Sequence, residues 1–152
     1  MTAAAAIGTG SRPQAPTHLW IVGVLAGVWN LMGAFDYLAT QLTLESYMSQ
    51  FSEEQLNYFY AFPTWMVAAW AIAIWSSFFG SVGLLLRKAW AVPLYGAALV
   101  GLAISTIYNF VLSNGAEIMG QQAVVFTGLI WLIALLLFFY SRAMVGQGIL
   151  KR

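Results

Sequence analysis

The chain has 152 residues, of which 61% are hydrophobic and only 7% are charged. A soluble domain carries roughly 25% charged residues, which it needs to cover its surface, so lipid has to be the covering solvent here. The net charge is +1 with six basic residues, and nucleic-acid binding requires clustered Lys and Arg, so no nucleic-acid partner is expected. The absence of cysteine excludes disulfides, thiolate catalysis and Cys-based metal sites.

The chain begins with a segment, residues 1–18, that is rich in Ala, Gly, Ser and Pro. Pro13 and Pro16 would interrupt a helix that started there, so this segment is expected to be a flexible tail. Four apolar stretches follow, and each is long enough to provide the ~20 helical residues that cross a bilayer. These stretches are residues 19–41, 63–86, 89–112 and 122–141. Because they are continuous and do not alternate with polar residues, they predict an all-α transmembrane bundle of four helices that forms one domain, 19–141.

The connection between the first and second stretches is the longest, and it is not plain coil. Ser52 and Gln55 have the spacing of a helix capping box, and Leu56, Phe59 and Tyr60 follow at helical spacing. A short helix lying in the membrane interface is therefore predicted. Its expected role is to seal this end of the bundle, and the alternative is a lid over a site.

The basic residues are segregated along the chain. They lie before the first stretch, between the second and third, and after the fourth: Arg12, Arg87, Lys88, Arg142, Lys151 and Arg152. The positive-inside rule then places both termini in the cytoplasm, with residues 142–152 as a basic cytoplasmic tail. The acids of the connections fall on the opposite side: Glu45, Glu53, Glu54 and Glu117. Aromatic rings near the expected boundaries are interpreted as anchors: Trp20, Trp90, Tyr95 and Tyr140 inside, and Tyr37, Trp65 and Tyr108 outside.

Small residues form a stripe on each of the first three stretches. The stripes are Gly23, Gly27, Asn30 and Ala34; Ala69, Ala73, Ser76 and Gly80; and Ala97, Gly101, Ser105 and Asn109. Such stripes allow helix backbones to approach closely. The fourth stretch is bulkier, so we expect it to face lipid or another subunit.

The inventory of reactive side chains is small. His18 is the only histidine, and it lies at the inner end of the first stretch, where we interpret it as an interfacial side chain. One histidine cannot build a bis-histidine haem site, a multi-histidine metal site or a Ser-His-Asp triad with the distant acids. No cofactor, no metal and no enzymatic activity are expected.

A few polar residues lie within the outer halves of the stretches. Asp36, Asn109 and Thr127 share one depth, about one turn below the outer boundary. Asn30 lies deeper and about 120° around the helix from Asp36, so the two need not point at one cavity. An ionisable residue inside a membrane span is a functional hypothesis by default. Asp36 is therefore either part of a site or a structural residue that reaches water or neighbouring amides.

Three runs of the sequence resemble a known kind of protein. These runs are 29–37 (WNLMGAFDY), 59–65 (FYAFPTW) and 107–113 (IYNFVLS). They are similar to runs in small inner-membrane proteins of Proteobacteria that often carry a loose "sugar transporter" label, and the resemblance covers roughly residues 19–142. It implies a multi-pass protein of the bacterial inner membrane, and it brings no assigned binding residue.

Two classes of function follow. The first is a carrier of a small, sugar-like solute that acts as an oligomer, since one such bundle encloses little more than its own side chains. Its candidate binding residues are Asp36, Asn30, Asn109, Trp65 and Thr127, with Trp70 as a further aromatic platform. The alternative is a non-catalytic accessory or scaffold subunit that docks to a larger membrane complex.

Overall fold

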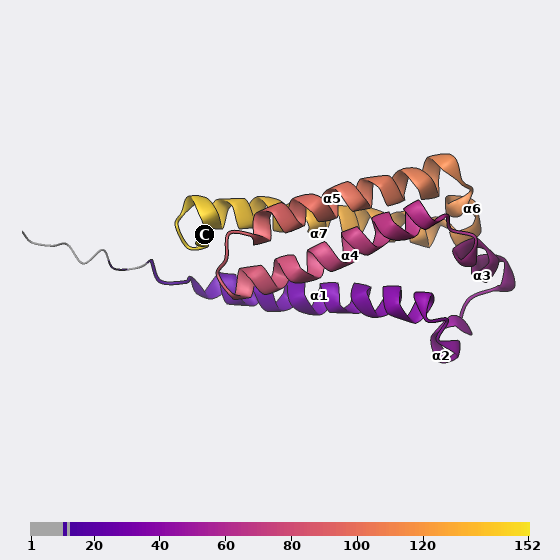
Figure 1. Ribbon diagram of the computed structural model, residues 1–152, viewed down its shortest axis with the longest axis horizontal. Coiled ribbons are helices and arrows are strands. Elements are labelled where there is room, and N and C mark those ends of the chain that lie inside the picture. The colour runs from indigo at the N-terminus through magenta and orange to yellow at the C-terminus, as the bar shows by residue number, and fades with distance from the viewer. Residues whose placement is uncertain (1–10, 12) are drawn as a thin grey trace, which may run out of the picture.

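The computed structural model describes residue 11 and residues 13–152, and it shows four long helices joined by short helices and turns (Figure 1). The long helices are α1 (Thr17–Gln41), α4 (Thr64–Leu85), α5 (Ala91–Ile107) and α7 (Gln121–Gly146). A π-helical turn, η1 (Tyr108–Leu112), continues α5, and the connections contain α2 (Glu45–Met48), α3 (Glu53–Tyr60) and α6 (Gly115–Met119). No strand is present in the described part of the chain, so the predicted all-α class is confirmed.

Four helical segments are long and apolar enough to cross a membrane, as the sequence predicts. They are Thr17–Gln41, Thr64–Leu85, Ala91–Leu112 and Gln121–Gly146. Their ends agree with the predicted ones to within two residues, except that α7 continues from Ser141 to Gly146. Ser141 and Met144 are buried in this extension, and Ile149 and Leu150 are buried beyond it. The segment 142–152 is therefore packed onto the bundle, whereas most of the expected tail 1–18 lies outside the described residues.

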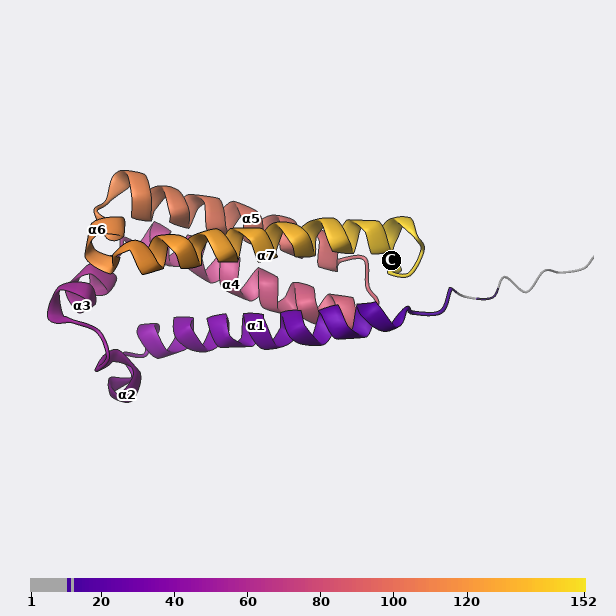
Figure 2. The ribbon, with the colours of Figure 1, turned by 180° about the vertical axis from the view of Figure 1, so that it is seen from behind.

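The four long helices lie side by side, with all the short helices at one end (Figures 1 and 2). Helix α4 packs against both α1 and α5, and α5 also packs against α7. We call the end that carries α2, α3 and α6 the α3 end. The opposite end, with residues 13–16, the 86–90 connection and the C-terminus, is the terminal end. The described N-terminal residues and the C-terminus thus meet at one end, as four antiparallel helices require.

The densest core lies at the terminal end. Leu19, Leu84 and Tyr95 are each at most 1% exposed there, and residues from all four long helices surround them. The Tyr95 hydroxyl lies 2.9 Å from Ser81 Oγ, so this ring has a polar partner inside the protein. The interpretation of Tyr95 as a boundary anchor is wrong for that reason, whereas Trp20 is exposed as an anchor would be.

Three chain segments are tied together at the terminal end. The Lys151 amide donates to the Arg87 carbonyl at 2.9 Å, and the Ala89 amide donates to the Lys151 carbonyl at 2.7 Å. Arg87 has a φ of 57°, a left-handed conformation that turns the chain out of α4. Its side chain donates to the carbonyls of Ile149 at 3.3 Å and Pro13 at 2.9 Å. The α4–α5 connection therefore holds both the C-terminal segment and the residues that precede α1.

The small-residue stripes mark one very close helix contact. A Cβ built on Gly101 would lie 2.6 Å from the Ala69 carbonyl oxygen and 2.7 Å from the Ala73 nitrogen, so the backbones of α5 and α4 touch here. A Cβ on Gly27 would meet nothing within 4 Å, so this glycine is not part of such a contact. Helix α7 is the least covered of the four long helices. Within the protein, 6% of its apolar stretch is buried, against 22% to 28% of the apolar stretches in the other three.

The short helix α3 begins at the predicted capping box. The Gln55 amide donates to Ser52 Oγ, and the Ser52 amide donates to Gln55 Oε1, both at 3.2 Å. Tyr58 is the buried ring of α3, at 8% exposure, while Tyr60 is 51% exposed. Helix α3 thus packs onto the bundle through a residue outside the predicted apolar spacing.

Candidate functional site

Two adjoining cavities lie between the long helices, from the middle of the bundle towards the α3 end. The middle cavity, of about 380 Å³, is lined mainly by α1, α4, α5 and α7. The end cavity, of about 340 Å³, adds residues from α3, η1 and α6 to its walls. Both walls contain Asp36, Trp70, Leu102, Ser105 and Ile130. The two cavities therefore share part of their walls, and we call them together the interior region.

Asp36 is one of the five residues that line both cavities, and it is the one ionisable residue among them. Its Oδ1 accepts a hydrogen bond of 2.5 Å from the Tyr47 hydroxyl, and the Tyr47 ring also lies edge-on to Phe35, with centroids 5.5 Å apart. Burial, together with the neighbouring Asp36 carboxylate, raises the pKa of Tyr47 above its ordinary value. The hydroxyl therefore stays protonated and remains a donor. Tyr47 belongs to α2, so this short helix is held over Asp36.

Asn30 lines the middle cavity together with Asp36. The cavity is lined by α1, α4, α5 and α7 together, so it includes side chains that lie about 120° apart on α1. The Asn30 amide nitrogen donates to Ser81 Oγ at 2.8 Å and to the Ser77 carbonyl at 3.2 Å.

Asn109 lines the end cavity, and both its amide oxygen and its amide nitrogen have a partner inside the protein. Its Oδ1 accepts from the Tyr58 hydroxyl at 2.6 Å, and its Nδ2 donates to the Ser105 carbonyl at 2.8 Å. The Tyr58 hydroxyl also lies 2.8 Å from Ser113 Oγ. Burial raises the pKa of Tyr58, so its hydroxyl is a donor at neutral pH. These bonds fasten α3 to the π-helical turn η1.

The two remaining predicted site residues differ in position. Thr127 lines the end cavity, and its hydroxyl donates to the Ala123 carbonyl of its own helix at 2.8 Å. Trp65 lines neither cavity, since it is 49% exposed and lies edge-on to Tyr108, with centroids 5.5 Å apart. Trp70 is the tryptophan that faces both cavities. Sequence position alone places both tryptophans at similar depths and does not tell which faces inward.

Aromatic rings close the α3 end of the region. Phe62 contacts Phe59, Trp70 and Tyr108, with centroids 5.5 to 6.2 Å apart, and Phe59 also contacts Phe51 at 5.1 Å. Phe51, Phe59 and Phe62 all line the end cavity. The α3 segment therefore contributes to the wall of the end cavity.

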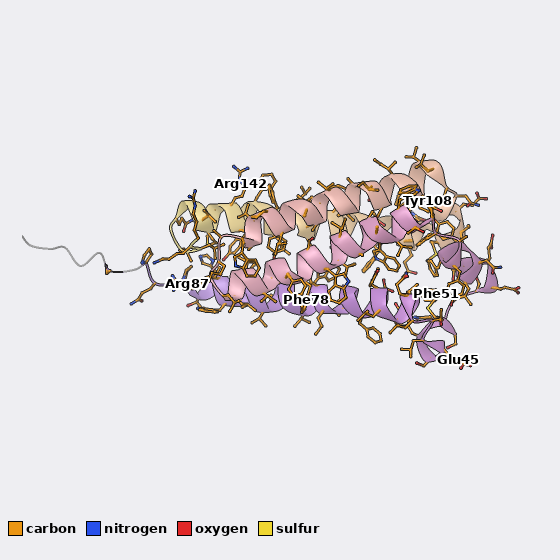
Figure 3. All side chains as sticks on the ribbon, in the orientation of Figure 1. Glu45, Phe51, Phe78, Arg87, Tyr108 and Arg142 are labelled. Carbon is orange, nitrogen blue, oxygen red and sulfur yellow. The ribbon has the colours of Figure 1, made fainter. Side chains whose placement is uncertain are left out.

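Charges are separated between the two ends of the bundle. Figure 3 shows Glu45 at the α3 end, and Arg87 and Arg142 towards the terminal end. The described basic residues all follow this pattern, since they lie in the 86–90 connection, near the end of α7, or after it. Among the described residues no group of three or more His, Cys, Asp or Glu side chains could hold a metal ion.

An apolar groove of about 650 Å³ runs between α1 and α7 beside the middle cavity. Nearly all of its lining is apolar, with residues such as Val22, Leu25 and Leu136. The groove and the middle cavity share Trp29, Ile133 and Leu137. The interior region is thus bordered by an open side between these two helices.

A scan of protein-family models, a search of curated proteins and a search of solved structures found no match to this chain.

Proposed function

We propose that this chain is a multi-pass inner-membrane protein that binds a small solute in the two cavities and carries it as an oligomer. The observation that supports this most is the position of Asp36. Asp36 is the only acid in the four apolar segments, and it lines both cavities. A carboxylate inside a membrane span is costly, so its location at a cavity wall is best explained by binding.

The proposed orientation places both termini in the cytoplasm and α3 at the outer interface. The support is the segregation of basic residues to the terminal end, which the positive-inside rule assigns to the cytoplasm. Reporter fusions after Lys88 and after Arg152 should then read cytoplasmic, and fusions near Gln50 and Gly115 should read periplasmic. A periplasmic signal after Lys88 would overturn this orientation.

The oligomer is proposed from the exposed side of the bundle. Helix α7 buries little of its apolar length within one chain, and its exposed residues include Phe126, Leu132 and Leu136. The same face favours the second candidate, an accessory subunit that docks to a larger complex, because a docking partner would cover it equally well. Native mass spectrometry from mild detergent separates the two candidates: an oligomer of this chain supports the carrier, and a monomer supports the accessory subunit.

Ligand binding is tested by a thermal-shift screen of the purified protein against sugars, polyols, amino acids and organic cations. We expect at least one class to raise the melting temperature, and we expect the shift to vanish in Asp36→Asn, which keeps the shape of the side chain and removes its charge. Glu54→Gln makes the same chemical change at an exposed position outside both cavities and should keep the shift. If no class of compound gives an Asp36-dependent shift, the carrier proposal fails.

A further inference from the structure

We infer that the solute is an organic cation with an apolar body, which enters sideways between α1 and α7 and places its positive group beside Asp36. This inference rests on the proposed function and names the solute class for the same site. It differs from the sugar-like class that the resemblance implies.

The first argument is the state of the neutral polar groups in the cavities. Asn109 uses its Oδ1 and its Nδ2 within the protein, and the Asn30 amide nitrogen donates to two groups of α4. The hydroxyls of Ser105 and Thr127 donate to carbonyls of their own helices. A sugar needs several free donors as well as acceptors, and these side chains use most of their donors within the protein. Asp36, with a single hydrogen bond from Tyr47, is the strongest acceptor left for a solute.

The second argument is charge complementarity. Buried charges in proteins are paired, and the basic residues of the described chain are gathered at the terminal end, away from Asp36. A cation that enters the cavity would supply the missing partner. The walls suit such a cation, since the rings of Trp29, Trp70 and Phe126 line the same cavity as Asp36. Aromatic faces attract ammonium-type cations, and a carboxylate strengthens that attraction.

The third argument concerns the route. The groove between α1 and α7 has an almost wholly apolar lining, and it adjoins the middle cavity, with which it shares Trp29, Ile133 and Leu137. Helices α1 and α7 flank it without the close packing that joins α4 to α1 and α5. An apolar body dissolved in the bilayer can occupy such a groove, whereas a sugar would lose its hydration there. The polar end of the solute would then meet Asp36 at the inner end of the route.

The test uses two probes of the same shape and opposite charge, tetraphenylphosphonium and tetraphenylborate. Equilibrium binding is measured on the full chain in lipid nanodiscs, and binding to empty nanodiscs is subtracted. We expect saturable binding of the phosphonium and no saturable binding of the borate. This comparison uses the unaltered protein and requires no variant. Asp36→Asn should weaken phosphonium binding by about tenfold or more at an unchanged melting temperature. Equal binding of both ions, or phosphonium binding that Asp36→Asn leaves intact, overturns the inference.

The sideways route has its own matched pair of variants. Leu25 lines the groove and is 64% exposed, while its neighbour Val24 is 54% exposed and lies outside the groove. Leu25→Trp should slow association of the phosphonium several-fold, and Val24→Trp should not. Equal rates for the two variants overturn the route. If a sugar binds in an Asp36-dependent manner and the phosphonium does not, the proposed function stands and this inference fails. If the phosphonium does not bind and no class in the thermal-shift screen gives an Asp36-dependent shift, both fail.

Discussion

The contact between α4 and α5 can be tested by adding one methyl group. In Gly101→Ala the new Cβ would lie 2.6 Å from the Ala69 carbonyl oxygen and 2.7 Å from the Ala73 nitrogen. Favourable contacts between heavy atoms lie at about 3.5–4.0 Å, so the helices must separate by about 1 Å. Both obstructing atoms belong to the backbone, so no side chain can rotate to relieve the clash. Overpacking of this kind costs about 1–3 kcal/mol.

Gly128→Ala is the matched control, because Gly128 is also in the interior of a long helix and a Cβ there meets nothing within 4 Å. Alanine is a better helix former than glycine by about 1 kcal/mol, so this variant should be slightly more stable than the parent protein. Gly101→Ala has the same gain in helix propensity, so the two variants are expected to differ by the overpacking cost, about 1–3 kcal/mol in the free energy of unfolding. Denaturation with sodium dodecyl sulfate in mixed micelles measures this difference. If Gly101→Ala unfolds at the same detergent fraction as Gly128→Ala, the proposed backbone contact is wrong.

Three further predictions concern the core and the terminal end. Ser81→Ala removes a hydroxyl that bonds to side chains of α1 and α5, so it should lower the free energy of unfolding by about 1–3 kcal/mol in the same assay. Leu84→Ala should cost about 2–5 kcal/mol because Leu84 is 0% exposed, whereas Leu135→Ala, at 38% exposure, should cost clearly less; equal losses would mean that α7 is central to the packing. Arg87→Ala removes two bonds to backbone carbonyls, so protease should cleave residues 147–151 faster, and an unchanged cleavage rate would argue against the tie.

The helices themselves were predictable because crossing a membrane depends on local properties, namely length and apolar character. Helix α7 extends beyond the end of the predicted apolar stretch, which was residue 141. Arg142 marks an apparent boundary for hydropathy, but α7 continues because Ser141 and Met144 are buried against the core. Such packing depends on residues of other helices, which hydropathy does not include.

The site was predictable only in part for a similar reason. Depth along a helix can be counted from the sequence, and this was sufficient to select Asp36, Asn109 and Thr127 as neighbours of one region. The partners Tyr47 and Tyr58 were not selected, because they come from connections whose path back over the bundle has no periodic signal. The direction in which a side chain points could not be predicted either. Tyr95 was interpreted as an anchor at the membrane boundary, but it is buried in the core.

The tie at the terminal end makes the bundle mechanically asymmetric. The α4–α5 connection holds both the C-terminal segment and the residues before α1, and the dense core lies directly beneath it. At the α3 end the connections are held instead by side-chain hydrogen bonds, from Tyr47 to Asp36 and from Tyr58 to Asn109. Helices α1 and α7 are linked by the His18–Tyr140 hydrogen bond of 2.6 Å and by the contact of Trp29 with Phe126, with ring centroids 5.8 Å apart. The sideways route that we infer therefore lies between these two links, and a solute that uses it leaves the hydrogen bonds at both ends of the bundle intact.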